Sequence, residues 1–77
     1  MSKLPVVSGK KLIKALSKAG YFVHDQKGSH SHLRHPDKRP LTVPKHKTIA
    51  KGTLKAILKQ SGIDIEEFLN LLIVLTE

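Results

Sequence analysis

Cysteine is absent from this chain of 77 residues, and aromatic and acidic side chains are few. The lack of cysteine excludes a disulfide-stabilised scaffold, a cysteine-based zinc finger and a thiol nucleophile. The aromatic residues Tyr21, Phe22 and Phe68 are too few for the stacking surfaces of RRM-type or OB-type RNA binders. The longest apolar run, Leu71–Leu75, is far shorter than the ~20 residues that a membrane span requires.

The length predicts a single domain, spanning residues 1–77, with a thin core. A domain of this size buries only ~60–65% of the surface of its unfolded chain, so we expect marginal stability or support from a partner. The first residues, Met1–Pro5, contain no apolar signal segment. This predicts a cytoplasmic protein that makes no membrane contact.

The charge is strongly positive and unevenly distributed. The formal net charge is +8, and all fourteen lysine and arginine residues lie between residues 1 and 62, where only Asp25 and Asp37 are acidic. Residues 63–77 carry acidic side chains and no basic ones. A basic body with an acidic end is the pattern expected of a protein that binds a polyanion. A membrane surface is a poorer partner, because the lysines do not gather on one long amphipathic helix with aromatic anchors.

Three helices are predicted from their apolar spacing and end signals. Ser8 is placed to cap a helix over Gly9–Ala19, and Lys51–Ser61 reads as a second amphipathic helix. Asp64 and Glu67 form a capping pair for a third helix, which is nearly apolar around its circumference. The surplus of apolar side chains over Phe68–Leu75 predicts that this helix either belongs to the core or contacts another chain.

Three short strands lie between the first two helices, over Tyr21–Lys27, Ser29–His35 and Leu41–Val43. The element order predicts an α+β fold in which the helices cover one face of a three-stranded antiparallel sheet. Strand alternation places Ser31, Leu33 and His35 on one face and His30, His32 and Arg34 on the other. Because Leu33 is the apolar member, its face is assigned to the core, and the second set points toward solvent or a ligand.

Five histidines are the unusual feature of the composition. His30, His32 and His35 form an H-x-H-x-x-H pattern typical of metal ligands, but strand alternation separates His35 from the others, and zinc sites converge three or four ligands. The acidic residues are too few for paired-carboxylate hydrolysis. A serine nucleophile, Ser29 or Ser31, would lack the glycine-lined turn that hydrolases use. We therefore expect no metal and no cofactor.

A histidine in a strongly positive environment suits RNA chemistry. An imidazole with a pKa of ~6.5 exchanges protons near neutral pH, and a deprotonated ribose 2′-hydroxyl attacks the adjacent phosphate. Lysine and arginine side chains nearby would hold the phosphate and stabilise its developing charge. The composition permits this chemistry without demonstrating it. A non-catalytic RNA-binding module and a histidine-rich metal-binding protein remain the alternatives.

An ordered set of motifs resembles the HicA family of toxins, also called YcfA-like. The set is Gly28-Ser29-His30, then Val43-Pro44-Lys45-His46, then the G-T-L-x-x-I-L pattern of residues 52–58. The resemblance extends from Leu4 to about Leu72. It implies a double-stranded-RNA-binding-like fold, α-β-β-β-α, with an additional C-terminal helix.

The resemblance also implies a function. Members of the family are toxins of type II toxin–antitoxin systems, and act as endoribonucleases that cleave messenger RNA and arrest growth. The implied protein partner is a HicB-type antitoxin, which binds the toxin. The antitoxin is expected to cover the face that carries His30. The apolar surplus of Phe68–Leu75 offers either a second contact with the antitoxin or a dimer interface, so we expect a monomer or a weak dimer when the chain is free.

The site residues follow from the motifs. The resemblance implies that His30 is the catalytic histidine and that Gly28 and Ser29 place it. His46 matches the histidine of V-P-x-H, for which we expect substrate contact or a structural role. The other residues expected to bind or position RNA are His32, Arg34, Lys45 and Lys51.

Overall fold

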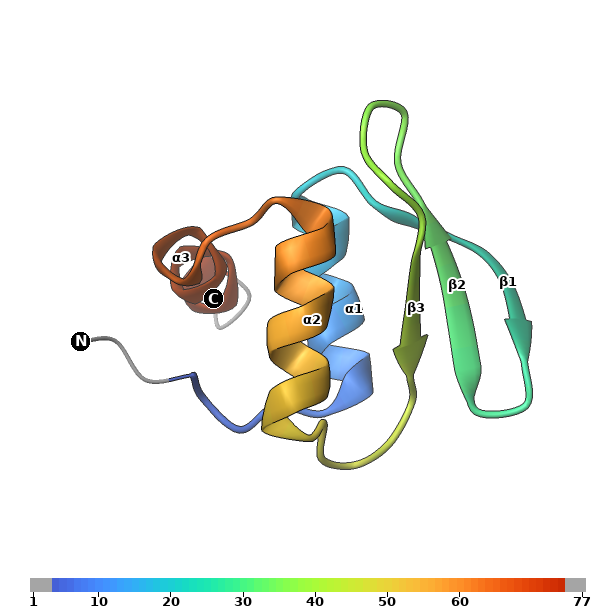
Figure 1. Ribbon diagram of the computed structural model, residues 1–77, viewed down its shortest axis with the longest axis horizontal. Coiled ribbons are helices and arrows are strands. Elements are labelled where there is room, and N and C mark those ends of the chain that lie inside the picture. Colours follow the sequence, from blue (N-terminus) through green and yellow to red (C-terminus); the bar gives the residue numbers. More distant parts are fainter. Residues whose placement is uncertain (1–3, 75–77) are drawn as a thin grey trace.

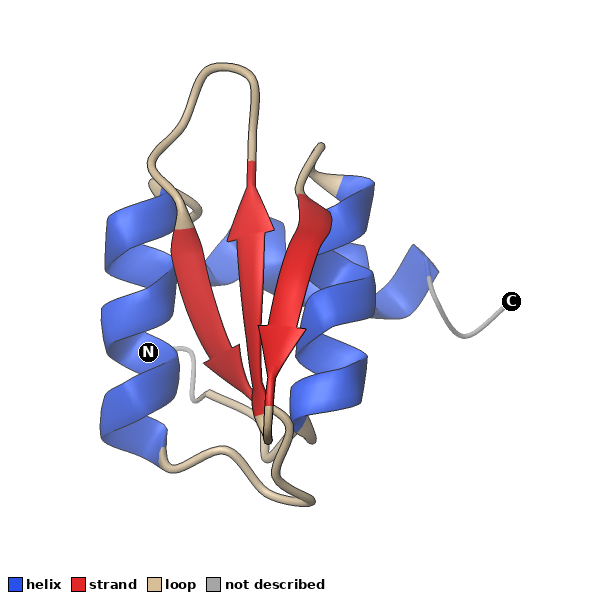
Figure 2. Cartoon of the chain, turned by 90° about the vertical axis from the view of Figure 1, so that its right-hand side faces the viewer, coloured by secondary structure: helices blue, strands red, loops and turns tan. Residues whose placement is uncertain are grey.

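The structure is a computed structural model that describes residues 4–74. The elements are α1 (Gly9–Lys18), β1 (Phe22–Lys27), β2 (His30–Arg34), β3 (Leu41–Pro44), α2 (Lys51–Ser61) and α3 (Ile65–Val74). The strands form one antiparallel sheet in the order β1-β2-β3. The helices lie on one side of this sheet (Figure 1), and its other face is uncovered toward the viewer in Figure 2. The predicted α+β fold is confirmed.

The helix ends follow the predicted signals. The Ser8 Oγ accepts a hydrogen bond of 3.1 Å from the backbone N–H of Lys11, and so caps α1. At the other end, Gly20 adopts a φ of 103° and the Tyr21 N–H donates to the Leu16 carbonyl. This closure of the helix uses Tyr21, which explains why β1 begins one residue later than predicted.

The third helix is capped and anchored as the sequence indicates. The Asp64 Oδ1 accepts a hydrogen bond of 2.8 Å from the Glu67 N–H. Ile63 and Phe68 are both buried, on either side of this cap, and α3 packs against α1. Ile73 is 62% exposed, so part of the apolar surplus does face outward. Leu75, the last residue of the surplus, lies outside the described residues.

The core lies between the sheet and the helices. Its largest fully buried apolar side chains are Leu12, Leu16, Leu33, Leu54, Val43 and Phe68. Every element except β1 contributes at least one of them, and α1 contributes two, so the fold depends on all three helices closing over β2 and β3. Among residues 4–74, no helix has the length and apolar character needed to cross a bilayer.

A β-bulge interrupts the pairing of β1 with β2. The register shifts between Val23, which lies opposite Leu33, and Asp25, which lies opposite His32. His24 is therefore the extra residue of the bulge. The bulge keeps Val23 on the helix-covered face and turns Asp25 to the open face of the sheet.

Candidate functional site

The backbone brings four segments together at one end of the sheet. The β1–β2 turn, the start of β2, the loop after β3 and the start of α1 all lie at the lower end of Figure 1. The Lys45 N–H donates a hydrogen bond of 2.6 Å to the Ser29 carbonyl, which ties the loop to the turn. The Gly9 N–H donates one of 2.9 Å to the His46 carbonyl, which ties the same loop to α1. The G-S-H and V-P-x-H motifs therefore lie side by side.

Gly28 serves this site through its backbone conformation. Its φ is 57°, in the left-handed region, as the turn between β1 and β2 requires. Nothing lies within 4 Å of the position where a Cβ would stand, so space is not the constraint. The glycine sets the direction in which the chain passes through Ser29 and enters β2 at His30.

His30 and His46 are both exposed, and their ring centroids are 6.4 Å apart at an interplanar angle of 69°. His30 lies in the register opposite Lys27 on one side and Pro44 on the other. The predicted outward direction of His30 is confirmed by its exposure. A phosphate at this end of the sheet would meet two imidazoles rather than one.

The start of α1 approaches the site so closely that no side chain fits at Gly9. A Cβ there would clash with the Pro44 carbonyl oxygen and would lie 2.8 Å from the Lys45 Cα. Both obstacles are backbone atoms, which do not move aside as a flexible side chain does. Gly9 thus allows α1 and the loop that carries His46 to stay in contact.

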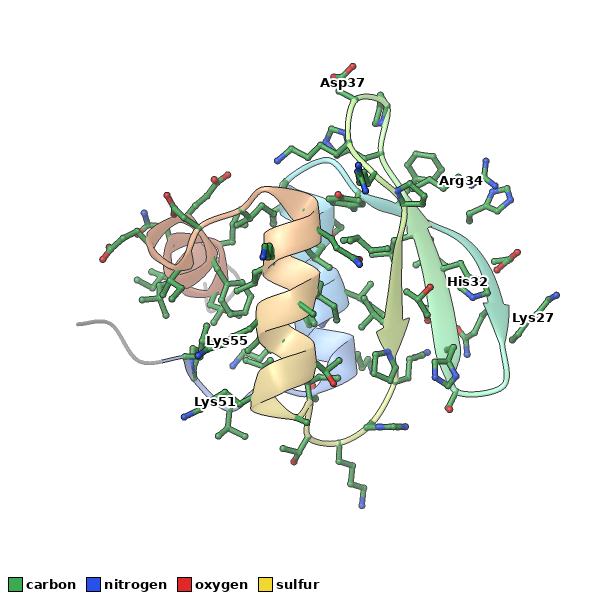
Figure 3. All side chains as sticks on the ribbon, viewed as in Figure 1. Lys27, His32, Arg34, Asp37, Lys51 and Lys55 are labelled. Atoms are coloured by element: carbon green, nitrogen blue, oxygen red, sulfur yellow. The ribbon has the colours of Figure 1, made fainter. Side chains whose placement is uncertain are left out.

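A second cluster lies on the open face of the sheet. Lys27, His32 and Arg34 point away from the helices (Figure 3). The His32 Nδ1–H donates a hydrogen bond of 2.6 Å to the Asp25 Oδ1, and both side chains are partly exposed. This hydrogen bond, helped by the nearby positive charges, lowers the pKa of Asp25. The pair borders a shallow hollow of about 260 Å³ that Arg34 and Thr42 also line.

Asp25 is the residue that the sequence interpretation missed. The sequence alone presents it only as one of two acidic residues in the basic part of the chain. Without knowledge of the bulge, strand alternation places Asp25 and His32 in a register that does not bring them together. The sequence signal that could have pointed to Asp25 is its position as a single acidic residue within a basic, histidine-rich hairpin.

His35 has a structural role. Its Nε2–H donates a hydrogen bond of 3.0 Å to the Ala19 carbonyl, and its Nδ1 accepts one of 2.9 Å from the Asp37 N–H. Its ring meets Tyr21 edge-on, with centroids 4.9 Å apart. Since both ring nitrogens are engaged, His35 belongs to the packing between α1, β2 and the following loop.

The remaining predicted RNA contacts are not all brought to one place. The Lys45 Nζ lies 3.4 Å from the Gln26 Oε1, beside the β1–β2 hairpin and next to His46. Lys51 lies at the first residue of α2, with its side chain pointing away from the sheet (Figure 3). RNA contact by Lys51 therefore stays a prediction, and it requires a strand that also passes over α2.

The structure describes no arrangement suited to holding a metal ion. Within residues 4–74, no three histidine, aspartate or glutamate side chains converge. A larger hollow of about 590 Å³ lies between α2, the start of α3 and Leu4. Four of its eight lining residues are apolar and four are charged, and none is a histidine. We therefore place the candidate site at the exposed His30–His46 end of the sheet and not in this hollow.

Comparisons with known proteins identify a family and a similar solved structure. The sequence model described as "HicA toxin of bacterial toxin-antitoxin" matches residues 9–63, which include both histidines of the site. A solved structure described as "Toxin-Antitoxin complex from Streptococcus pneumoniae" contains a chain with 31% sequence identity and a TM-score of 0.66. The similarity covers 74% of this chain and 98% of that one. A search of curated proteins finds no match. On the match over residues 9–63, the chain belongs to the HicA family of bacterial toxins.

Proposed function

We propose that this chain is the toxin of a type II toxin–antitoxin system, and that it is an endoribonuclease that cleaves messenger RNA without a metal ion. Membership of the HicA family supports a toxin with nuclease activity. The observation that carries the mechanism is the exposed position of His30 at the end of the sheet, beside His46 and next to Lys27 and Lys45.

His30 transfers a proton in the cleavage step. The reaction begins when the ribose 2′-hydroxyl loses its proton and its oxygen attacks the adjacent phosphorus. An imidazole suits this task because its ordinary pKa lies near neutral pH. The expected products are a 2′,3′-cyclic phosphate and a 5′-hydroxyl. The reaction that forms them needs neither a metal ion nor a cofactor.

Basic side chains hold the RNA backbone. His32 and Arg34 continue from His30 along the open face of the sheet, and residues two apart on a strand are spaced by roughly 7 Å. An extended RNA strand that follows β2 would present successive phosphates to these side chains. Gly28 and Ser29 set the turn, and Lys45 and Lys51 add positive charge at the end of the sheet and on α2.

An antitoxin of the HicB type is the expected protein partner. The similar chain from Streptococcus pneumoniae was solved as part of a toxin–antitoxin complex. An antitoxin that covered the His30 end of the sheet would block access of RNA. We expect the free chain to be a single domain over residues 1–77, cytoplasmic, and a monomer or weak dimer.

The test is cleavage of a defined messenger RNA by the purified chain in the presence of EDTA. His30→Ala should lower the rate by ~10²–10⁴-fold while RNA binding survives. The unfolding midpoint should stay unchanged, because the side chain is exposed. Products ending in a 5′-phosphate, or a strict requirement for magnesium, would overturn the mechanism. In an inducible host, equal toxicity of the wild type and His30→Ala would overturn the site.

A non-catalytic RNA-binding module is the second candidate. The positive charge and the open sheet face favour RNA binding whether or not a bond is cut. This candidate predicts that the purified chain binds RNA and leaves it intact, and that His30→Ala changes affinity alone. Both candidates share a dependence on salt, so the cleavage assay is what separates them.

A further inference from the structure

The imidazole rings of His30 and His46, at the end of the sheet, are accessible to a substrate. Within residues 4–74, neither the His30 ring nor the His46 ring forms a hydrogen bond, and both side chains are exposed. Their centroids are 6.4 Å apart. Hydrogen bonds from a charged donor to a phosphate are ~2.7–2.9 Å long. A phosphodiester seated between the rings is therefore within reach of both.

The other histidines are engaged elsewhere or lie apart. The His32 Nδ1 is bound to Asp25, and both ring nitrogens of His35 are occupied. His24 is the extra residue of the bulge in β1, away from the turn at which β2 begins. His46 is thus the histidine placed to share a phosphate with His30.

The backbone holds the pair in place from both sides. The loop that carries His46 is bound to the β1–β2 turn by the hydrogen bond from Lys45 to Ser29, and to α1 by the one from Gly9. The close approach of Gly9 to the backbone of Pro44 and Lys45 keeps the end of β3 and the start of this loop against α1. A reaction gains rate when the reacting groups are held in position before the substrate arrives.

We propose that His46 supplies a second proton transfer, so that His30 and His46 act as one acid–base pair. This inference rests on the proposed function and gives His46 a chemical role beyond substrate contact. The substrate is the phosphodiester of RNA, which needs both a base for its 2′-hydroxyl and an acid for its leaving oxygen.

The step balances without a further reactant. The 2′-hydroxyl gives its proton to the neutral imidazole while the O2′–P bond forms. The P–O5′ bond breaks, its electron pair stays on O5′, and the protonated imidazole gives O5′ a proton. The products are the 2′,3′-cyclic phosphate and the 5′-hydroxyl, and the two rings have exchanged protonation states. Exchange with water restores them.

The experiment compares His46→Gln with the wild type on two substrates. Glutamine keeps a hydrogen-bonding side chain but does not exchange protons near neutral pH. On ordinary RNA we expect a bell-shaped pH profile for the wild type. His46→Gln should lose one limb of that profile and ~10²–10⁴-fold of the rate. His24→Gln is the matched control and should keep both limbs.

The second substrate carries sulfur in place of the leaving O5′. A thiolate leaves without being protonated, so the variant that lacks the acid should regain rate on this substrate. The expected result is that one of His30→Gln and His46→Gln is rescued and the other is not, which also identifies the acid. Unfolding midpoints equal to that of the wild type would show that neither variant acts through the fold.

Three results would overturn the pair. They are a wild-type rate for His46→Gln, a reduced rate with both limbs of the pH profile intact, and rescue of neither variant by the sulfur substrate. Failure of the proposed function looks different. In that case the unmodified chain leaves RNA uncut, or His30→Gln cleaves as fast as the wild type.

Discussion

The Asp25 Oδ1 and the His32 Nδ1 lie 2.6 Å apart across the pairing of β1 with β2. The contact depends on the bulge, because a regular register after Val23 would place Asp25 opposite the buried Ser31 instead. With the Nδ1 occupied, the Nε2 of His32 is the nitrogen left for a ligand. The bulge thus lets the Asp25 carboxylate orient the His32 imidazole. Both side chains lie on the open face of the sheet, the face to which His30 also belongs.

Asp25 makes the stability of the fold depend on pH. Its folded-state pKa lies below the ordinary value of 3.8, because the ionised carboxylate accepts the hydrogen bond from His32. The ionised form therefore stabilises the fold above the unfolded pKa, and this contribution disappears as the pH falls through the folded pKa. Asp25→Asn should be less stable than the wild type near pH 7, and the difference should vanish in strong acid. Denaturant unfolding at a series of pH values measures this.

Asp37→Asn is the control for the carboxylate effect. Asp37 lies in the loop at the far end of the sheet (Figure 3), and no ion pair involves it within the part of the chain that the structure describes. Its replacement should leave the pH dependence as in the wild type. A pH profile of Asp25→Asn that runs parallel to the wild type would contradict the pairing with His32.

Replacement of His35 should lower the stability of the fold without lowering the cleavage rate, in contrast to replacement of His30. His35→Ala loses the hydrogen bonds to Ala19 and Asp37 and the edge contact with Tyr21. We expect a loss of about 1–3 kcal/mol in the free energy of unfolding, with an unchanged cleavage rate per folded molecule. Denaturant unfolding and single-turnover cleavage, measured on the same samples, test both parts. A cleavage defect in His35→Ala without loss of stability would show that this histidine acts in the site.

Arg34 should contribute to RNA affinity through one phosphate. RNA binding is measured with the inactive His30→Ala background, over a range of salt concentrations. For single strands, each phosphate contact adds ~0.7 to the slope of log affinity against log salt. Arg34→Ala should make the slope shallower by about that amount. Lys59→Ala, in the last turn of α2 and next to α3, should leave the slope unchanged.

Much of the fold could be predicted because its signals are local. The cap at Ser8, the turn at Gly28 and the capping pair of Asp64 and Glu67 each depend on the conformation of a few neighbouring residues. The exposed direction of His30 and the burial of Leu33 follow from strand alternation together with the apolar character of Leu33. These features are dictated by backbone sterics and by the period of the strand, which the sequence displays directly.

The arrangement of the site could not be predicted in the same way. The contact between His30 and His46 depends on the pairing of β2 with β3 and on the approach of α1. The pairing of Asp25 with His32 depends on an extra residue in one strand, which no local pattern indicates. The part that each of these residues plays in RNA cleavage stays a prediction until cleavage is measured.

Gly9 offers a test of the site that touches no histidine. In Gly9→Ala, the new Cβ would meet the Pro44 carbonyl oxygen and the Lys45 Cα, so either α1 or the loop must shift. Crowding of this kind typically costs about 1–3 kcal/mol, and the shift would move His46 relative to His30. We expect a lower unfolding midpoint and a lower cleavage rate in the molecules that remain folded.

Gly52→Ala is the matched substitution, because a Cβ at Gly52 meets nothing within 4 Å and the residue lies within α2. Alanine is favoured over glycine inside a helix by roughly 0.5–1 kcal/mol, so this variant should be as stable as the wild type or more so, and equally active. If Gly9→Ala cleaved RNA at the wild-type rate, the loop that carries His46 would not need its contact with α1. The position of His46 would then have to be set by the Lys45–Ser29 hydrogen bond alone.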